Sequence, residues 1–160
     1  MKLINRDADY ALKALLALAV RPRDVTAVSE LTEELDVPRP YLRKIMQRLA
    51  QEKVVLSFKG KGGGFRLARS AGDIALADVI RTFQGRISLH DCLFRERLCP
   101  DIKTCPLRKT IGRLEDRLVR ELETLSIASV LSGENMPAGS RDAHFNGGAP
   151  SKPSKKRRHP

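Results

Sequence analysis

Residues 39–67, RPYLRKIMQRLAQEKVVLSFKGKGGGFRL, contain two successive patterns that say most about the fold. The first part, through Gln51, repeats apolar residues every three or four positions and has Pro40 in its first turn, which predicts a helix with a basic outer face. The second part places a β-branched run at 54–58, a glycine-rich tip at 59–64 and a short apolar run at 65–67. This order predicts a β-hairpin with a basic tip.

Two further helices are predicted upstream of this stretch. Leucines and alanines at helical spacing predict a first helix that ends near Pro22, and a second helix is expected to begin at Ser29 and to end at the break over 36–38. Two helices joined by a tight turn, the second one basic, are typical of a helix-turn-helix, and the hairpin that follows is typical of a wing. The sequence therefore predicts a DNA-binding surface made of a recognition helix and a wing.

Candidate DNA contacts come from both parts of this surface. The alternatives are a solvated basic face, which the added wing and charge make less favourable, and a nucleotide-binding loop, which is disfavoured because Lys61 precedes the glycines and no Gly-Lys-Ser/Thr step follows. The candidates are Arg39, Tyr41, Arg43, Lys44, Lys59, Lys61 and Arg66.

The remaining chain divides into segments of different composition. A short helix over 74–84 is expected to close a first unit at Gly85, and a leucine stripe from Leu107 to Leu125 predicts a helix that packs against a second copy of the chain or against the first helix. The expected fold is mainly α with a small β-hairpin. The expected units are a winged helix-turn-helix domain over 1–85, a cysteine loop over 86–106, a dimerisation helix over 107–131 and a disordered basic tail over 132–160.

The charge of the 160-residue chain favours a polyanionic partner. Its formal net charge is +11 and its pI is near 10.1, and nucleic acid rewards such charge through counterion release. The longest apolar run, Ala14 to Val20, is far shorter than the roughly 20 residues of a membrane-spanning helix, and charges at Arg6, Asp7 and Asp9 argue against a signal peptide. A cytoplasmic protein acting at the nucleoid, with no membrane partner, is expected.

Three cysteines lie within fourteen positions of one another, at Cys92, Cys99 and Cys105. An odd number without an export signal favours reduced thiols, and thiolates on a loop interrupted by prolines can converge on a soft metal. An iron–sulfur cluster or zinc would each need a fourth ligand, and zinc is less favoured because the paired Cys-x2-4-Cys hook is missing. The alternative is three unliganded thiols, or a disulfide formed on oxidation, which the spacing within one short window makes less favourable. Candidate fourth ligands are His90, Asp91, His144 and a carboxylate from elsewhere in a dimer.

The order of these features resembles the bacterial IscR/NsrR/RirA (Rrf2-type) family of iron–sulfur transcriptional regulators, over about residues 1–130. The matching stretches are 9–12, 41–42, the wing over 59–67 and the three-cysteine segment. The resemblance implies a dimeric winged-helix repressor or activator with a [2Fe-2S] or [4Fe-4S] cluster. It further implies that Cys92, Cys99 and Cys105 are ligands and that the signal is iron supply, cluster supply, nitric oxide or redox state.

The fourth ligand differs between branches of this family. IscR-like members use a histidine three positions after the last cysteine, where this chain has Arg108, whereas NsrR-like members use an aspartate in the first helix of the partner subunit. Asp9 occupies the matching place, and we predict that it is the fourth ligand; the alternative is a carboxylate that stabilises the helix N-terminus. The gap of six residues between Cys92 and Cys99 differs from the five common in IscR and NsrR, which leaves the cluster type open.

The sequence therefore predicts a homodimeric transcriptional regulator, expected to be a repressor, that binds a double-stranded DNA operator. An iron–sulfur cluster is expected to control this binding by fixing the spacing of the two recognition helices. An enzyme with a small-molecule substrate is not expected, because no acid, base and nucleophile gather beside the cysteines. The alternative is a zinc- or thiol-based regulator without a cluster. An iron–sulfur electron carrier and a basic adaptor for protein or RNA are more distant rivals.

Overall fold

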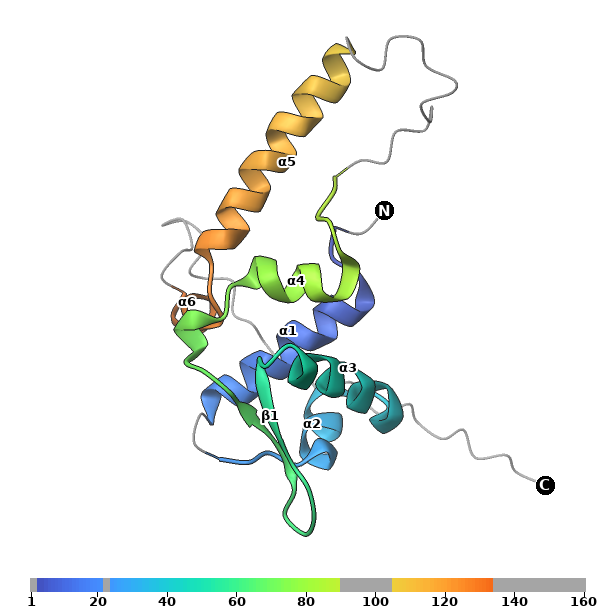
Figure 1. The fold of residues 1–160 in the computed structure, drawn as a ribbon, viewed down its shortest axis with the longest axis vertical. Helices are drawn as coiled ribbons and strands as arrows, with labels where there is room; N and C mark the ends of the chain where they lie inside the picture. Colours follow the sequence, from blue (N-terminus) through green and yellow to red (C-terminus); the bar gives the residue numbers. More distant parts are fainter. Residues whose placement is uncertain (1–2, 22–23, 90–104, 134–160) are drawn as a thin grey trace, which may run out of the picture.

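A computed structural model describes residues 3–21, 24–89 and 105–133 (Figure 1). It confirms the predicted fold class, because the described residues are mainly helical and contain one two-stranded antiparallel sheet. Among the described residues, no helix is both long and apolar enough to cross a bilayer. The elements in chain order are α1 (Arg6–Val20), α2 (Val28–Leu35), α3 (Arg39–Gln51), β1 (Val55–Phe58), β2 (Gly64–Leu67), the short 3-10 helix η1 (Ala71–Asp73), α4 (Leu76–Gln84), α5 (Pro106–Thr124) and α6 (Ile127–Ser132).

The helix-turn-helix forms from α2 and α3, which pack against each other. Asp36 ends α2 in the left-handed conformation, with φ 50° and ψ 48°, and α3 begins three residues later with proline in its first turn, as predicted. Ser29 does not cap α2, because Ala27 occupies the N-cap position. The inner face of α3 enters the core through Leu42, Ile45, Met46 and Leu49.

The wing is the hairpin of β1 and β2, with Val55 opposite Leu67 and Phe58 opposite Gly64. A third segment joins it, because Thr26 and Phe65 exchange two backbone hydrogen bonds of 2.9 Å each. A Cβ atom on Gly64 would run into the Thr26 carbonyl oxygen, so glycine permits this close approach. Sequence patterns did not reveal the pairing, since a single bridging residue leaves no strand periodicity.

The core surrounds α1, which packs against α2, α3, α4, α6 and β2. We expected a stripe of Leu12, Leu15, Leu16 and Ala19; Leu15 is fully buried, whereas the other three are half-buried at the edge of the core. Because neighbours cover α1 on several sides, its deepest positions include small side chains that allow close packing. The buried residues of α1 are Ala8, Ala11, Ala14, Leu15, Ala17 and Leu18.

The C-terminal part corrects the expectation of one helix over 107–131. The structure contains α5 and α6 with a break between them, where Ser126 and Ser129 form a reciprocal capping box. At the break, the Leu76 amide donates to the Leu125 carbonyl over 2.9 Å, and the Ile127 amide donates to the Ile74 carbonyl over 3.0 Å. These bonds direct α6 back onto the core around α1. The expected cysteine loop and basic tail lie mostly outside the described residues.

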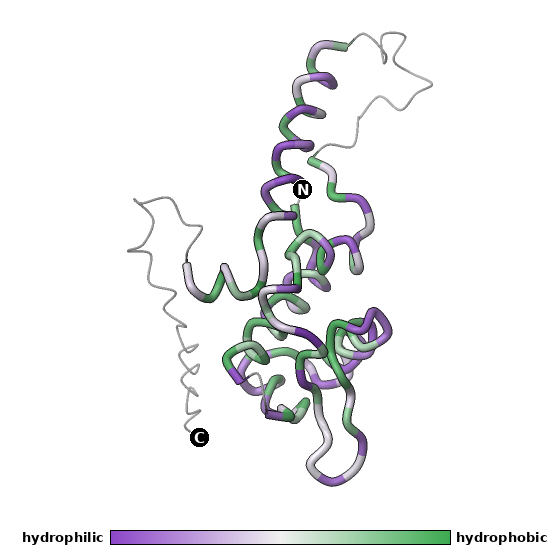
Figure 2. The backbone as a smooth tube through the Cα atoms, turned by 60° about the vertical axis from the view of Figure 1, so that its left-hand side comes forward, coloured by the Kyte–Doolittle hydropathy of each residue, from purple (hydrophilic) through white to green (hydrophobic). Residues whose placement is uncertain are grey.

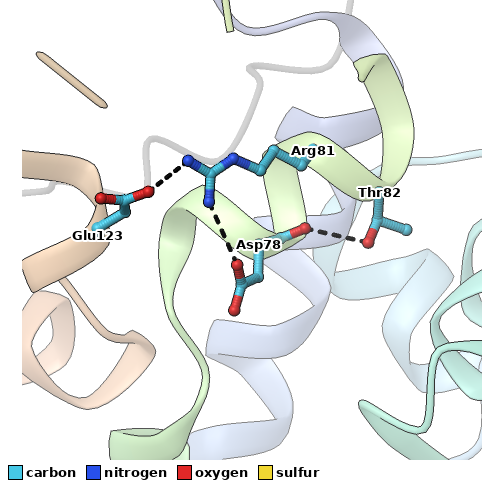
Figure 3. A network of polar contacts seen from close by, with 4 residues as sticks. All are labelled: Asp78, Arg81, Thr82 and Glu123. Atoms are coloured by element: carbon cyan, nitrogen blue, oxygen red, sulfur yellow. Dashed lines mark hydrogen bonds and ion pairs between the residues drawn. The ribbon is translucent and has the colours of Figure 1, made fainter. Parts of the chain in front are cut away.

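The longest helix among the described residues, α5, packs mainly against α4, and Leu12 of α1 borders the same apolar cluster. Leu122 near its C-terminal end is buried with Ala77 and Ile80 of α4. Arg81 of α4 bridges the two helices by pairing with Glu123 of α5 and with Asp78 of its own helix (Figure 3). Away from this junction α5 extends from the body of the molecule, opposite to the end that carries the wing (Figure 1).

Candidate nucleic-acid interface and cysteine segment

A groove with a volume of about 460 Å³ lies between the start of α2, the outer face of α3 and the wing. Arg39 and Arg43 enter it from α3, and Lys59 enters from the wing. None of the described residues that line it is acidic. Three cations therefore face one concave surface without a local counter-charge, as expected of a surface that binds phosphates.

The two arginines share a face because they are four residues apart on the helix, and Gln47 continues the same row into the groove. The tip of the wing can approach a ligand closely, because Gly60 and Gly62 adopt φ of 96° and 80°, which favour glycine. A Cβ on Gly63 would lie 2.5 Å from the Phe58 carbonyl oxygen. The glycines therefore shape the tip as well as leaving its backbone accessible.

The other predicted DNA contacts lie around this groove. Arg66 places its guanidinium 5.4 Å from the ring centre of Phe58 on the wing, and Lys61 is exposed at the tip. Lys44 and Tyr41 line a second hollow, on the side of α3 that faces Asp7. The structure therefore brings Arg39, Arg43 and Lys59 together and places Tyr41 and Lys44 on a separate row.

Tyr41 makes a contact that sequence reasoning did not find. Its hydroxyl donates to the Oδ1 atom of Asp7 in the first turn of α1, and this hydrogen bond raises the pKa of the phenol. The Tyr41 ring also meets the Tyr10 ring edge to face, with centres 5.7 Å apart. The bonded residues are 34 positions apart, so no local spacing indicated the pair.

Two predicted metal-ligand residues fall within the described chain. Cys105 occupies the N-cap position of α5, is partly exposed and forms no disulfide. Asp9 lies in the first turn of α1, and its carboxylate pairs with Lys13 at 2.9 Å while remaining half-exposed. Cys92, Cys99 and the alternative ligands His90, Asp91 and His144 lie outside the described residues.

Within residues 3–21, 24–89 and 105–133, no group of three or more His, Cys, Asp or Glu side chains is placed to hold a metal ion. The ligand set thus stays a prediction. Its chemistry fits an iron–sulfur centre, because three thiol ligands are of the soft type that such centres require and Cys105 is partly exposed. The N-terminal end of α5 also favours a negatively charged ligand at Cys105.

A buried carboxylate fixes the chain immediately before the cysteine segment. Glu115 of α5 is 7% exposed and accepts hydrogen bonds from Arg86 at 2.8 Å, Ser88 Oγ at 3.1 Å and the Leu89 amide at 3.2 Å. Burial alone would raise the pKa of Glu115, but these three donors hold it below its usual range. No sequence motif indicated this contact. It attaches residues 86–89 to the helix that begins after Cys105.

Comparison with known proteins places the chain among transcriptional regulators. The model of a family described as "Rrf2: Iron-dependent Transcriptional regulator" matches residues 4–133.

Solved structures share the same fold. CymR (YrzC), the global cysteine regulator of B. subtilis, is 22% identical with a TM-score of 0.69, over 83% of this chain and 98% of that one. IscR of T. potens is 20% identical with a TM-score of 0.66, over 84% and 88% of the two chains. A protein from Listeria innocua is 22% identical with a TM-score of 0.71, over 91% of this chain and 93% of that one. Similarity at this level of identity establishes the fold alone.

Proposed function

This chain belongs to the Rrf2 family of DNA-binding transcriptional regulators, and on that basis we propose that it is an iron–sulfur-dependent repressor. The observation that supports the DNA-binding half of this proposal is the groove between α3 and the wing, where Arg39, Arg43 and Lys59 face one surface that has no acidic lining residue. Members of this family are regulators and not enzymes.

In the proposed complex, α3 enters the major groove and the wing follows the adjacent backbone. Arg39 and Arg43 lie near the start of α3, where a recognition helix meets base edges, and a bidentate arginine distinguishes guanine from other bases. Lys59, Lys61 and Arg66 bind phosphates or the minor groove from the wing. Lys44, on the neighbouring row of α3, adds a phosphate contact.

A second copy of the chain is the proposed partner of α5. Leu107 and Leu114 are 64% and 51% exposed, and with Ile111 and Leu118 they form one stripe along the helix. Figure 2 shows apolar and polar turns alternating along this projecting helix. Covering the stripe with the same stripe of a second copy gives a two-fold dimer whose recognition helices meet two half-sites about one DNA turn apart.

The proposed ligands of the cluster are Cys92, Cys99 and Cys105 with the partner subunit's Asp9. The half-exposed carboxylate of Asp9 supports this assignment, because it is accessible to a second chain. A carboxylate is a weak and displaceable ligand of iron, which suits a sensor. When bound, the cluster supplies chemistry that responds to iron, nitric oxide or oxidants. The residues of this chain would convert that response into the spacing of the two α3 helices.

The test combines operator selection with substitution of Asp9. The wild-type protein, purified without oxygen, is used to enrich a duplex from a randomised pool, and affinity for that duplex is measured before and after removal of iron. Asp9→Ala is expected to shorten the lifetime of the visible absorbance and to weaken binding. Lys13→Ala is the matched control, because it removes the ion-pair partner of Asp9 and leaves the carboxylate. Equal cluster lifetimes in wild type and Asp9→Ala would reject Asp9 as a ligand.

A thiol-based regulator without a cluster is the second candidate. It is favoured by the structural similarity to CymR, which is described as a cysteine regulator, and by the partial exposure of the Cys105 thiol. Under this alternative, iron-free protein binds the selected duplex fully, and thiol oxidation changes its affinity.

A further inference from the structure

The contact between Tyr41 and Asp7 joins the recognition helix to a part of α1 that is itself fixed. Asn5 caps α1 by accepting from the Ala8 amide at 2.8 Å, and its own backbone amide donates to Gln84 Oε1 at 2.7 Å. Its side-chain amide donates to the Phe83 carbonyl at 3.2 Å. The first turn of α1 is therefore held against the end of α4, and Asp7 presents its carboxylate from a firmly held position.

Tyr41 belongs to α3, between the two arginines that face the groove. Arg39 and Arg43 occupy one row of this helix, and Tyr41 points away from that row toward Asp7. A rotation of α3 about its axis would separate the Tyr41 hydroxyl from Asp7. The hydrogen bond therefore resists the motion that would redirect both arginines relative to the wing.

The surrounding contacts favour the same orientation of Tyr41. Its ring lies edge to face against Tyr10, with an angle of 86° between the ring planes. Arg6 and Lys13 lie 5.8 Å and 5.6 Å from the centre of the Tyr10 ring. These cations hold the Tyr10 ring in place. The hydroxyl and the ring of Tyr41 thus both contact α1.

We infer that Tyr41 is a positioning residue, which sets the direction of Arg39 and Arg43 through Asp7 and does not itself bind DNA. This inference rests on the proposed DNA contacts of the two arginines. It replaces the expectation that Tyr41 belongs to the DNA-contacting set. Its consequence is that Asp7, on another helix and outside the groove, contributes to operator selectivity.

A double-mutant cycle tests the inference. Tyr41→Phe, Asp7→Ala and the double variant are compared for binding to the duplex enriched by the wild-type protein and to a scrambled duplex at fixed salt. Each single change is expected to lower the ratio of the two affinities about three- to tenfold, which is the range of one lost hydrogen bond. The double variant is expected to lose no more than either single variant, because both remove the same bond.

Two controls separate positioning from other roles. Asp7→Asn keeps an oxygen that accepts from the Tyr41 hydroxyl, so selectivity should return toward the wild-type ratio. Tyr10→Phe removes the hydroxyl of the chain's other tyrosine and should leave selectivity unchanged. If Tyr41→Phe weakens binding while Asp7→Ala does not, the hydroxyl binds DNA directly and the inference is overturned. Unchanged selectivity in both variants also overturns it.

A measurement without DNA keeps this test independent of the proposed function. Amide hydrogen exchange over residues 39–46 is expected to be faster in Tyr41→Phe and Asp7→Ala than in wild type and Asp7→Asn, at equal thermal stability. If the wild-type protein enriches no duplex, the proposed function fails, and exchange alone decides whether Tyr41 orders α3. Identical exchange in all four proteins would contradict the inference.

Discussion

Arg86 donates to the buried carboxylate of Glu115 over 2.8 Å, and this ion pair attaches the chain before the cysteine segment to α5. Glu115 also accepts from Ser88 and from the Leu89 amide. Since Cys105 caps the same helix, both ends of the segment that contains Cys92 and Cys99 meet α5. Cys105 and Glu115 are ten residues apart, which is about 15 Å along the helix axis at 1.5 Å per residue.

Removing the Glu115 carboxylate should destabilise this attachment. Glu115→Ala is expected to cost about 1–3 kcal/mol of unfolding free energy, because it removes a buried carboxylate that accepts three hydrogen bonds. Glu123→Gln breaks the exposed pair with Arg81 on the same helix and should cost less than about 1 kcal/mol. Urea unfolding of both variants measures the difference, and equal losses would contradict the special role of Glu115.

The ion pair between Arg86 and Glu115 makes the free energy of unfolding depend on pH, and the direction of that dependence follows from the pKa of Glu115. Because the folded state holds the pKa of Glu115 below its usual range, its contribution is fully present above about pH 4.3. It is lost as the pH falls through the lower pKa of the folded state. The stability gap between wild type and Glu115→Ala should therefore narrow in acid, and a constant gap down to pH 3 would rule out this linkage.

Gly64 is expected to tolerate no side chain. Gly64→Ala would push a Cβ atom into the Thr26 backbone, which should cost roughly 1–3 kcal/mol and detach the wing from residues 24–27. Gly112→Ala is the control, because nothing lies within 4 Å of a Cβ there and alanine favours a helix by about 0.5–1 kcal/mol. Thermal unfolding should move in opposite directions for the two variants.

The α5 stripe predicts a variant that separates the dimer. Leu114→Glu places a charge in the proposed contact between copies and should shift the protein to monomer in light scattering at micromolar concentration. Leu131→Glu makes the same change on α6 at 45% exposure and should leave the dimer intact. A dimeric Leu114→Glu protein would show that α5 is not the interface.

Arg43 is expected to contact DNA phosphates or bases, and its loss should change the salt dependence of binding. Arg43→Gln should weaken operator binding and reduce the slope of log affinity against log salt by about one if the contact is to phosphate. Arg117→Gln removes an equal charge from the exposed side of α5 and should have little effect. Equal effects of the two would indicate that only net charge matters.

Local sequence patterns predicted those helices, strands and turns whose periodicity or turn residues lie within the element itself. The proline-led recognition helix, the basic hairpin and the stop at Gly85 follow from periodicity and turn chemistry, and the structure confirms them. Contacts between distant residues gave no such signal. Three long-range contacts each depend on how completed elements pack: the bridge of Thr26 to Phe65, the bridge of Ala75 to Ser126 and the Tyr41–Asp7 bond.

On the basic face of α3, the sequence likewise could not show which cations face the candidate site. Spacing alone identified Arg39, Arg43 and Lys44 as one group, yet the wing and α1 divide the face into two rows. Arg48 reaches the Thr82 carbonyl within the molecule. The wing and α1 therefore decide which cations of α3 face a ligand.

In the proposed mechanism, a metal centre on the three cysteines controls operator binding. The most direct measurement determines iron and sulfide per chain in anaerobically purified protein and compares the affinity of the same preparation for its selected duplex before and after iron is removed. We predict a coloured protein with both elements present and a marked loss of affinity on removal. Colourless, iron-free protein that binds the duplex with full affinity would show that no metal centre controls binding.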